Sequence, residues 1–208
     1  MAFGARLATA MRDHGPLCVG IDPHPEFLAR WGLTDSAESL VAFSDAILEA
    51  SVGAVAAVKP NSAFFERHGA RGIAALEHTL KRAKELSLLT ILDVKRGDIG
   101  STMEGYADAY LAHGAPLEAD AITVSPYLGF GSLRPAFELA EHSGKGVFVL
   151  ALTSNPEGTE VQHAVGRGNV SVARVIAESA AELNHGAQPM GSVGLVVGAT
   201  IGAAVAEL

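Results

Sequence analysis

The chain alternates between short, continuously apolar runs and longer segments in which apolar and polar residues mix at helical spacing. The apolar runs predict strands at 17–22, 54–59, 88–95, 120–125, 146–153 and 193–199. The mixed segments predict helices at 36–51, 70–86, 102–113, 130–142 and 170–184. Continuous apolar runs are typical of parallel strands that are buried on both faces. The strict β–α alternation therefore predicts an α/β fold with a parallel sheet.

The turn after the first strand decides between two kinds of parallel sheet. It reads GIDPHP, where a dinucleotide-binding sheet would need G-x-G-x-x-G, and the chain contains no Walker A sequence. This favours a (β/α)8 TIM barrel. Such a barrel closes with eight strands, so we expect residues 1–208 to be a single barrel domain that covers about the first six βα units and lacks the last two. The sequence is then either a clipped part of an intact protein, which we favour, or a truncated product. The last two units are where such barrels frequently bind phosphate, so no residue of this sequence is expected in that role.

Composition and charge narrow the range of partners. A net charge of −8 over 208 residues argues against general nucleic-acid or membrane-surface binding. Cys18 is the only cysteine, which excludes a disulfide framework and favours a reducing, cytoplasmic location.

Phe3, Leu7 and Met11 recur every four residues, as on a short amphipathic helix, and this pattern differs from that of a signal peptide. The apolar run at 192–208 is too short for a membrane span and is expected to be a core strand entering a helix.

Charged residues stand at the end of each of the first three predicted strands. The first ends on Asp22, the second on Lys59 before Pro60, and the third on Asp93 and Lys95. In each strand the charged positions have the same parity as the inward-facing apolar ones. Because the carboxyl ends of barrel strands converge on the active site, these four charges are expected to meet there. The alternative for Asp93 and Lys95 is a purely structural ion pair.

A second carboxylate, Asp98, follows the third strand in a turn framed by Gly97 and Gly100. The next helix is expected to begin with a capping box formed by Ser101 and Glu104.

The later strands end in neutral polar residues. The fourth strand ends with Thr123 and Ser125, and Ser154 and Asn155 follow at the end of the fifth. Ser154 and Asn155 could hydrogen-bond a planar heterocycle or could simply form a turn, and the sequence leaves both readings open. The glycine-containing stretch 155–170 is expected to be a mobile polar loop. The sequence does not decide whether this loop also acts as a lid.

These residues together resemble a known family. The segment from Asp93 to Asp98 forms a D-x-K-x-x-D motif, and the stretches VKPNSAFFE, KRGDIGST, SPYLGFGSLRP and TSNPEG accompany it. With these motifs the chain resembles orotidine 5′-phosphate decarboxylase, in the type 2 bacterial branch familiar from actinobacteria. The resemblance extends over about residues 17–200. The motif alone is also found in sugar-phosphate enzymes. Together with Asp22, Lys59 and Ser154, which occur in the same order along the chain, it is specific for this family.

The resemblance implies a homodimer of (β/α)8 barrels that converts orotidine 5′-phosphate to uridine monophosphate and CO2 without a metal or organic cofactor. Lys95 would protonate C6 of the pyrimidine. Asp93 and Lys59 would complete a charged network with it, and Asp98 would enter from the partner subunit.

The resemblance also implies the substrate contacts. Asp22 and Lys59 would hold the ribose hydroxyls, with Thr102 of the partner assisting. Ser154 would bond the pyrimidine edge.

Three alternatives stay open at this point. A sugar-phosphate decarboxylase or synthase of the same barrel group would bind Mg²⁺ at acidic strand ends, although Lys59 would repel the cation. A Schiff base on Lys95 would need a neutral amine, whereas adjacent carboxylates favour the ammonium. A truncated barrel could also bind a ligand without catalysing a reaction.

Overall fold

The computed structural model describes residues 1–166 and 168–208. Within these residues six parallel strands follow one another in chain order around an arc. They are β1 (Cys18–Ile21), β2 (Ala57–Pro60), β3 (Ile91–Arg96), β4 (Ala121–Val124), β5 (Gly146–Leu152) and β6 (Val193–Val197). Strands β1 and β2 form a two-stranded sheet, and β3 to β6 form a four-stranded sheet. Two isolated parallel bridges, Val58 to Thr90 and Asn61 to Asp93, join the two sheets.

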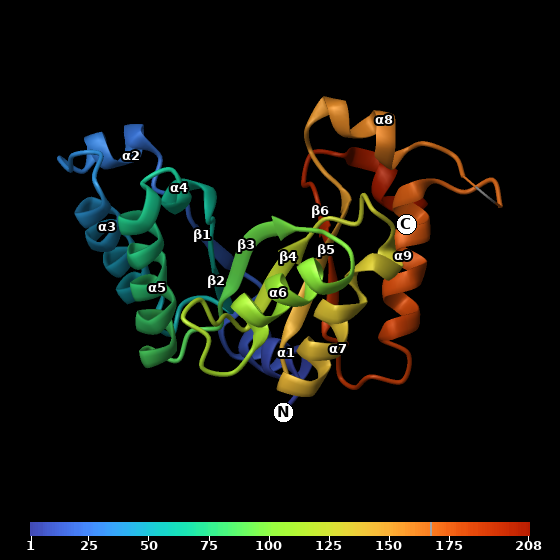
Figure 1. The fold of residues 1–208 in the computed structure, drawn as a ribbon, viewed down its shortest axis with the longest axis horizontal. Helices are drawn as coiled ribbons and strands as arrows, with labels where there is room; N and C mark the ends of the chain where they lie inside the picture. The colour runs from blue at the N-terminus through green and yellow to red at the C-terminus, as the bar shows by residue number, and fades with distance from the viewer. Residues whose placement is uncertain (167) are drawn as a thin grey trace.

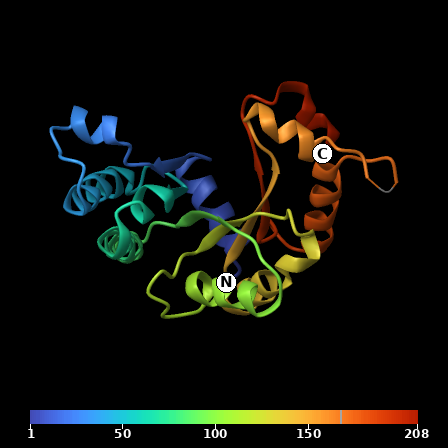
Figure 2. The same ribbon diagram turned by 45° about the horizontal axis from the view of Figure 1, so that its top comes forward.

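Most helices follow the strands and lie on the outer side of the arc, whereas the N-terminal helix precedes β1 and packs at the amino ends of the strands (Figure 1, Figure 2). The longer ones are α1 (Phe3–His14), α3 (Ala37–Ser51), α5 (Gly69–Glu85), α6 (Gly100–Leu111), α7 (Arg134–Ser143) and α9 (Val172–Leu183). Shorter helices are α2 (Pro25–Arg30), α4 (Ala63–Glu66), α8 (Thr159–Gln162) and the 3₁₀ turns η1 (Phe130–Leu133), η2 (Pro156–Gly158) and η3 (Gly202–Glu207). Six strands in sequential order with helices outside form an open portion of a (β/α)8 barrel, as the β–α alternation predicts.

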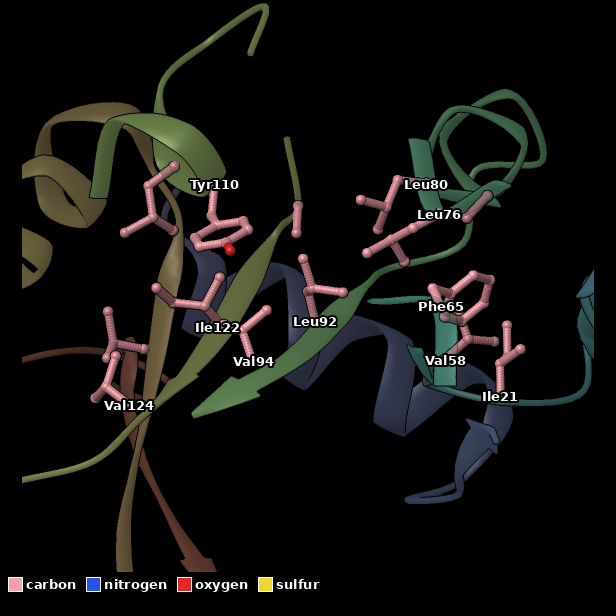
Figure 3. Packing of buried hydrophobic residues seen from close by; sticks show 14 of the residues in the cluster. Ile21, Val58, Phe65, Leu76, Leu80, Leu92, Val94, Tyr110, Ile122 and Val124 are labelled. Carbon is pink, nitrogen blue, oxygen red and sulfur yellow. The ribbon is translucent and has the colours of Figure 1, made fainter. Parts of the chain in front are cut away.

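The main core lies between the outer face of the sheet and the helices. On β3, Leu92 and Val94 are buried against these helices, where Leu76 of α5 and Tyr110 of α6 contribute to the same cluster. Figure 3 shows these side chains together with strand residues such as Ile122. Because strand side chains alternate, Asp93 and Lys95 must then face the inner side of the arc.

The inner side is apolar at the amino ends of the strands, where α1 covers it. Phe3 is buried with Ala57, Ile91 and Ala121 in a second cluster, and its ring meets that of Phe148 edge to face with centroids 6.0 Å apart. The inner face thus has an apolar floor, and Lys59, Asp93 and Lys95 lie toward the carboxyl ends of their strands.

The polar residue Arg6 ties α1 to the sheet. Its guanidinium pairs with Asp120 and donates to the carbonyl of Gly144. The predicted amphipathic N-terminal helix is therefore confirmed, and it closes the floor of the barrel.

Two local expectations were wrong. The capping box does not form, because α6 begins at Gly100, so Ser101 lies inside the first turn and no side chain caps the helix. The stretch 155–170 is not simply loop, since it contains η2 and α8. Position 167 of that stretch lies outside the described residues.

A candidate active site at the carboxyl ends of the strands

Asp93 is the centre of a hydrogen-bonded charge network on the inner face. The Nζ of Lys95 lies 2.7 Å from both of its carboxylate oxygens. The Nζ of Lys59 donates to Oδ2 at 3.2 Å, and the hydroxyl of Thr123 donates to Oδ1 at 2.8 Å. The carboxylate therefore receives donors from β2, β3 and β4, three neighbouring strands.

The parallel register explains why these residues meet. Lys59 and Asp93 lie near the carboxyl ends of adjacent strands, and the bridge from Asn61 to Asp93 aligns those ends. The side chain of Asp93 is 9% exposed, whereas those of Lys59 and Lys95 are 34% and 49% exposed. A buried carboxylate is thus flanked by two ammonium groups that a ligand in the open arc can reach.

The electrostatic state of Asp93 follows from two opposing effects. Burial by itself raises the pKa of this carboxyl, but hydrogen bonds from Lys95 and Thr123 and the positive charges of Lys59 and Lys95 lower it. The lowering effects win, so the pKa of Asp93 lies below the ordinary aspartate value. Asp93 is therefore a fixed negative charge at neutral pH.

Asp22 joins the network through a residue that the sequence argument missed. The amide of Asn61 donates to Oδ1 of Asp22 at 3.1 Å, and Asn61 is the residue bridged to Asp93. Asn61 has the same parity as Lys59, two residues earlier, so the alternation of β2 could have indicated it. Asp22, directly after β1, thus lies next to the network, and within the described part of the chain it makes no bond with either lysine.

Three predicted site residues lie outside this network. Asp98 accepts a hydrogen bond from the backbone N–H of Ile99 and makes none with Lys59 or Lys95 among the described residues. Thr102 is exposed on α6, and Ser154 is exposed just beyond β5. A single copy of the chain therefore brings together only part of the predicted set.

The neighbourhood of Ser154 supports turn chemistry for Asn155. The amide oxygen of Asn155 accepts from the Thr153 hydroxyl at 2.6 Å, and its amide nitrogen donates to Glu157 at 3.2 Å. Gln162 of α8 bonds both the backbone N–H and the hydroxyl of Thr153. Asn155 is thereby committed to the turn, while Ser154 stays a prediction for the substrate contact.

The donor set at the strand ends is unsuited to a divalent cation, because the buried carboxylate already faces two ammonium groups. Elsewhere in residues 1–166 and 168–208, histidine, cysteine, aspartate and glutamate side chains form no group of three or more that could hold a metal. Every helix in the described part of the chain is too short or too polar to span a bilayer.

Comparison with known proteins assigns the chain to a family. Residues 15–207 match the profile of the orotidine 5′-phosphate decarboxylase / HUMPS family. The chain belongs to this family. The orotidine 5′-phosphate decarboxylase of Salinispora arenicola is 59% identical over 201 residues, which span 97% of this chain and 72% of that protein. Identity at this level over almost the whole chain selects the decarboxylase branch, a carboxy-lyase of pyrimidine biosynthesis, over the sugar-phosphate alternatives.

Solved structures of the family agree with the fold. A crystal structure from Streptomyces avermitilis superposes with a TM-score of 0.96 at 57% identity, covering 99% of this chain and 72% of that one. The OMP decarboxylase of Leishmania donovani superposes with a TM-score of 0.81 at 36% identity, covering 100% of this chain and 74% of that one. The open arc is therefore the family's barrel over about its first six βα units, as predicted from the sequence.

Proposed function

We propose that Lys95 is the acid in the decarboxylation of orotidine 5′-phosphate. The bond between C6 of the pyrimidine and the carboxylate breaks, CO2 leaves, and the electron pair stays on C6. The ammonium of Lys95 then transfers a proton to C6, which gives uridine monophosphate and a neutral amine that solvent reprotonates. The observation that carries this proposal is the position of the Lys95 ammonium, 2.7 Å from Asp93 and half exposed at the strand ends.

The proposed role of the surrounding charges is electrostatic. The C6 carbanion has no conjugated carbonyl to accept its charge, so a fixed ammonium beside it is the main stabilising interaction available. Asp93 holds that ammonium in place through both carboxylate oxygens. Lys59 shares the same carboxylate and adds a second positive charge. The steps use only side chains, and neither a metal nor an organic cofactor takes part.

The proposed substrate contacts follow the strand ends. Asp22 and Lys59 bind the ribose hydroxyls, and the bond between Asn61 and Asp22 supports this by fixing the Asp22 carboxylate. Ser154, exposed after β5, bonds the pyrimidine edge. Thr102, exposed on α6, reaches the ribose of the partner's site.

We further propose that the site is completed by a second copy of the chain, which contributes Asp98. Asp98 lies three residues after Lys95, and its carboxylate accepts a hydrogen bond from the backbone N–H of Ile99 rather than from Lys95 among the described residues. Next to it, the apolar side chain of Ile99 is 62% exposed. An apolar residue exposed beside a carboxylate of the motif is what a subunit interface at this point would cover.

We also propose a cytoplasmic location. The single free cysteine, Cys18, is in keeping with a reducing compartment, and cell fractionation would test this.

The test is an absorbance assay that follows the loss of orotidine 5′-phosphate. Replacing Lys95 by alanine is expected to lower kcat by at least about 10⁴-fold, because both the proton donor and the charge are lost. Lys81→Ala, on the exposed face of α5, is the matched control and is expected to keep parent activity. Near-parent activity of the Lys95→Ala variant would contradict the assigned role. Loss of the parent's activity on adding a chelator would instead favour a metal-dependent reaction.

A further inference from the structure

The ladder between β3 and β4 contains an irregularity at the site. Leu92 pairs with Ile122, and Arg96 pairs with Val124, so three residues of β3 face the single residue Thr123 of β4. Within this bulge Lys95 has a φ of +46°, in the left-handed region that side chains other than glycine rarely adopt. Bulges of this kind redirect a side chain next to a functional site. The direction of the Lys95 side chain therefore depends on what holds the bulge in place.

Thr123 is the β4 residue that lies opposite the bulge. Its hydroxyl accepts a hydrogen bond from the backbone N–H of Lys95 at 2.9 Å and donates one to Oδ1 of Asp93 at 2.8 Å. Thr123 is 2% exposed, so its hydroxyl is shielded from solvent. A single hydroxyl thus links the backbone of the proposed acid to the carboxylate that its side chain contacts.

The backbone of Asp93 has a separate support on the other side. The backbone N–H and the hydroxyl of Ser62 both approach the carbonyl oxygen of Asp93, at 3.2 and 3.3 Å. Ser62 fixes Asp93 from the β2 side and makes no bond with Lys95 among the described residues. The link between Asp93 and the Lys95 backbone therefore depends on Thr123.

We propose that Thr123 is a positioning residue, which holds the β3 bulge so that the Lys95 ammonium turns back onto Asp93. Without the hydroxyl, the backbone N–H of Lys95 loses this partner, and the bond that accompanies the strained φ is gone. The backbone then relaxes toward extended geometry, in which residues two apart project side by side rather than toward each other. This proposal rests on the proposed role of Lys95, because it concerns how that residue is aimed.

Two variants of Thr123 separate the hydroxyl from the side-chain shape. Thr123→Val keeps the shape and removes both hydrogen bonds, whereas Thr123→Ser keeps the hydroxyl. In Thr123→Val we expect the amide hydrogen of Lys95 to exchange about tenfold faster, as loss of one hydrogen bond requires. The pKa of Asp93, followed by carboxyl NMR, is expected to rise, because one donor to the carboxylate is lost. We expect kcat to fall about a hundredfold with little change in KM, since a misaimed acid affects the chemical step.

Thr79→Val is the matched control, because Thr79 is also a buried threonine whose hydroxyl bonds a carbonyl, that of Ala75 inside α5. It is expected to cost stability but to leave the Lys95 exchange rate, the Asp93 titration and kcat unchanged. Restoration of all three quantities in Thr123→Ser supports the proposal. Unchanged exchange and titration in Thr123→Val, or parent kcat despite altered exchange, overturns it. If the parent itself shows no turnover, the proposed function fails, and the exchange and titration data still decide whether Thr123 holds the bulge.

Discussion

Lys95 and Asp93 are two positions apart on the same strand, yet the Lys95 ammonium lies 2.7 Å from both Asp93 carboxylate oxygens. On a regular strand such residues are roughly 6.6 Å apart along the chain, and their side chains run side by side. The positive φ of Lys95 ends the regular geometry and allows the side chain to return to its neighbour. The local backbone therefore determines this pairing as much as the attraction between the charges does.

The acid dependence of stability tests the state of Asp93. Its pKa in the folded protein lies below the ordinary aspartate value, which is about 3.9 in unfolded chains. A group with a depressed pKa contributes stability that is complete above the unfolded value and is lost as the pH falls through the folded value. Asp93→Asn is expected to cost about 1.5–3 kcal/mol at pH 7, as for hydrogen bonds to a charged group.

Urea unfolding of parent and Asp93→Asn between pH 7 and pH 3 measures this contribution. The difference between the two proteins should be constant down to about pH 5 and shrink below about pH 4. Asp13→Asn, which removes an exposed partner of Arg12, should change stability by less than about 0.5 kcal/mol. A difference that grows as the pH falls would show that Asp93 is not ionised in the folded state.

Two lysines that pair with the same carboxylate should differ sharply in their effect on stability. Lys145 has a side chain 5% exposed and donates to Glu118 at 2.8 Å and to the carbonyl of Ala119 at 2.7 Å. Burial raises the pKa of Glu118, but hydrogen bonds from Lys145 and Gly114 outweigh it and lower that pKa well below the ordinary value. Lys145→Met should destabilise the fold by about 3 kcal/mol or more, because Glu118 loses its buried partner.

Lys84→Met is the matched control, since Lys84 contacts Glu118 at 3.2 Å with a side chain that is 74% exposed. It should cost less than about 0.5 kcal/mol, as is usual for a surface ion pair. Thermal unfolding of the two variants measures the contrast, and equal losses would mean that burial does not set the strength of these pairs.

The turn after β3 depends on a glycine. A Cβ at Gly97 would lie 2.4 Å from the carbonyl oxygen of Ser125, which is backbone and cannot move aside easily. Gly97→Ala is therefore expected to cost about 1–3 kcal/mol and to lower kcat by shifting the motif. Gly105→Ala on the exposed side of α6 meets nothing within 4 Å and should stabilise by about 0.5–1 kcal/mol. Similar losses in both variants would contradict the proposed close approach.

Subunit mixing tests the shared site. Asp98→Ala and Lys95→Ala are each expected to be inactive, but a mixed dimer places an intact Asp98 and an intact Lys95 in one of its two sites. Activity should therefore return in part when the two inactive proteins exchange subunits. Subunit exchange proven by mass spectrometry, with no return of activity, would place Asp98 outside the neighbouring site.

Most of the fold could be predicted from the sequence, because hydrophobic periodicity is a local property. The apolar runs located six parallel strands, and their parity placed Lys59, Asp93 and Lys95 on one face at the strand ends. Asp98, Thr102 and Ser154 were indicated by the family motif, and their roles stay predictions because they depend on a partner or a substrate. The capping box failed because residue types alone do not determine where α6 begins.

Tertiary structure decided what depends on register between strands far apart in the sequence. The bulge opposite Thr123, the positive φ of Lys95 and the link from Asn61 to Asp22 arise only when β1 to β4 are aligned. The seating of Phe3 under the sheet likewise requires Ala57, Ile91 and Ala121 to converge. The sequence by itself therefore determined which side chains reach the inner face. Packing between strands determined how they are aimed, because a hydrogen bond needs both partners in place.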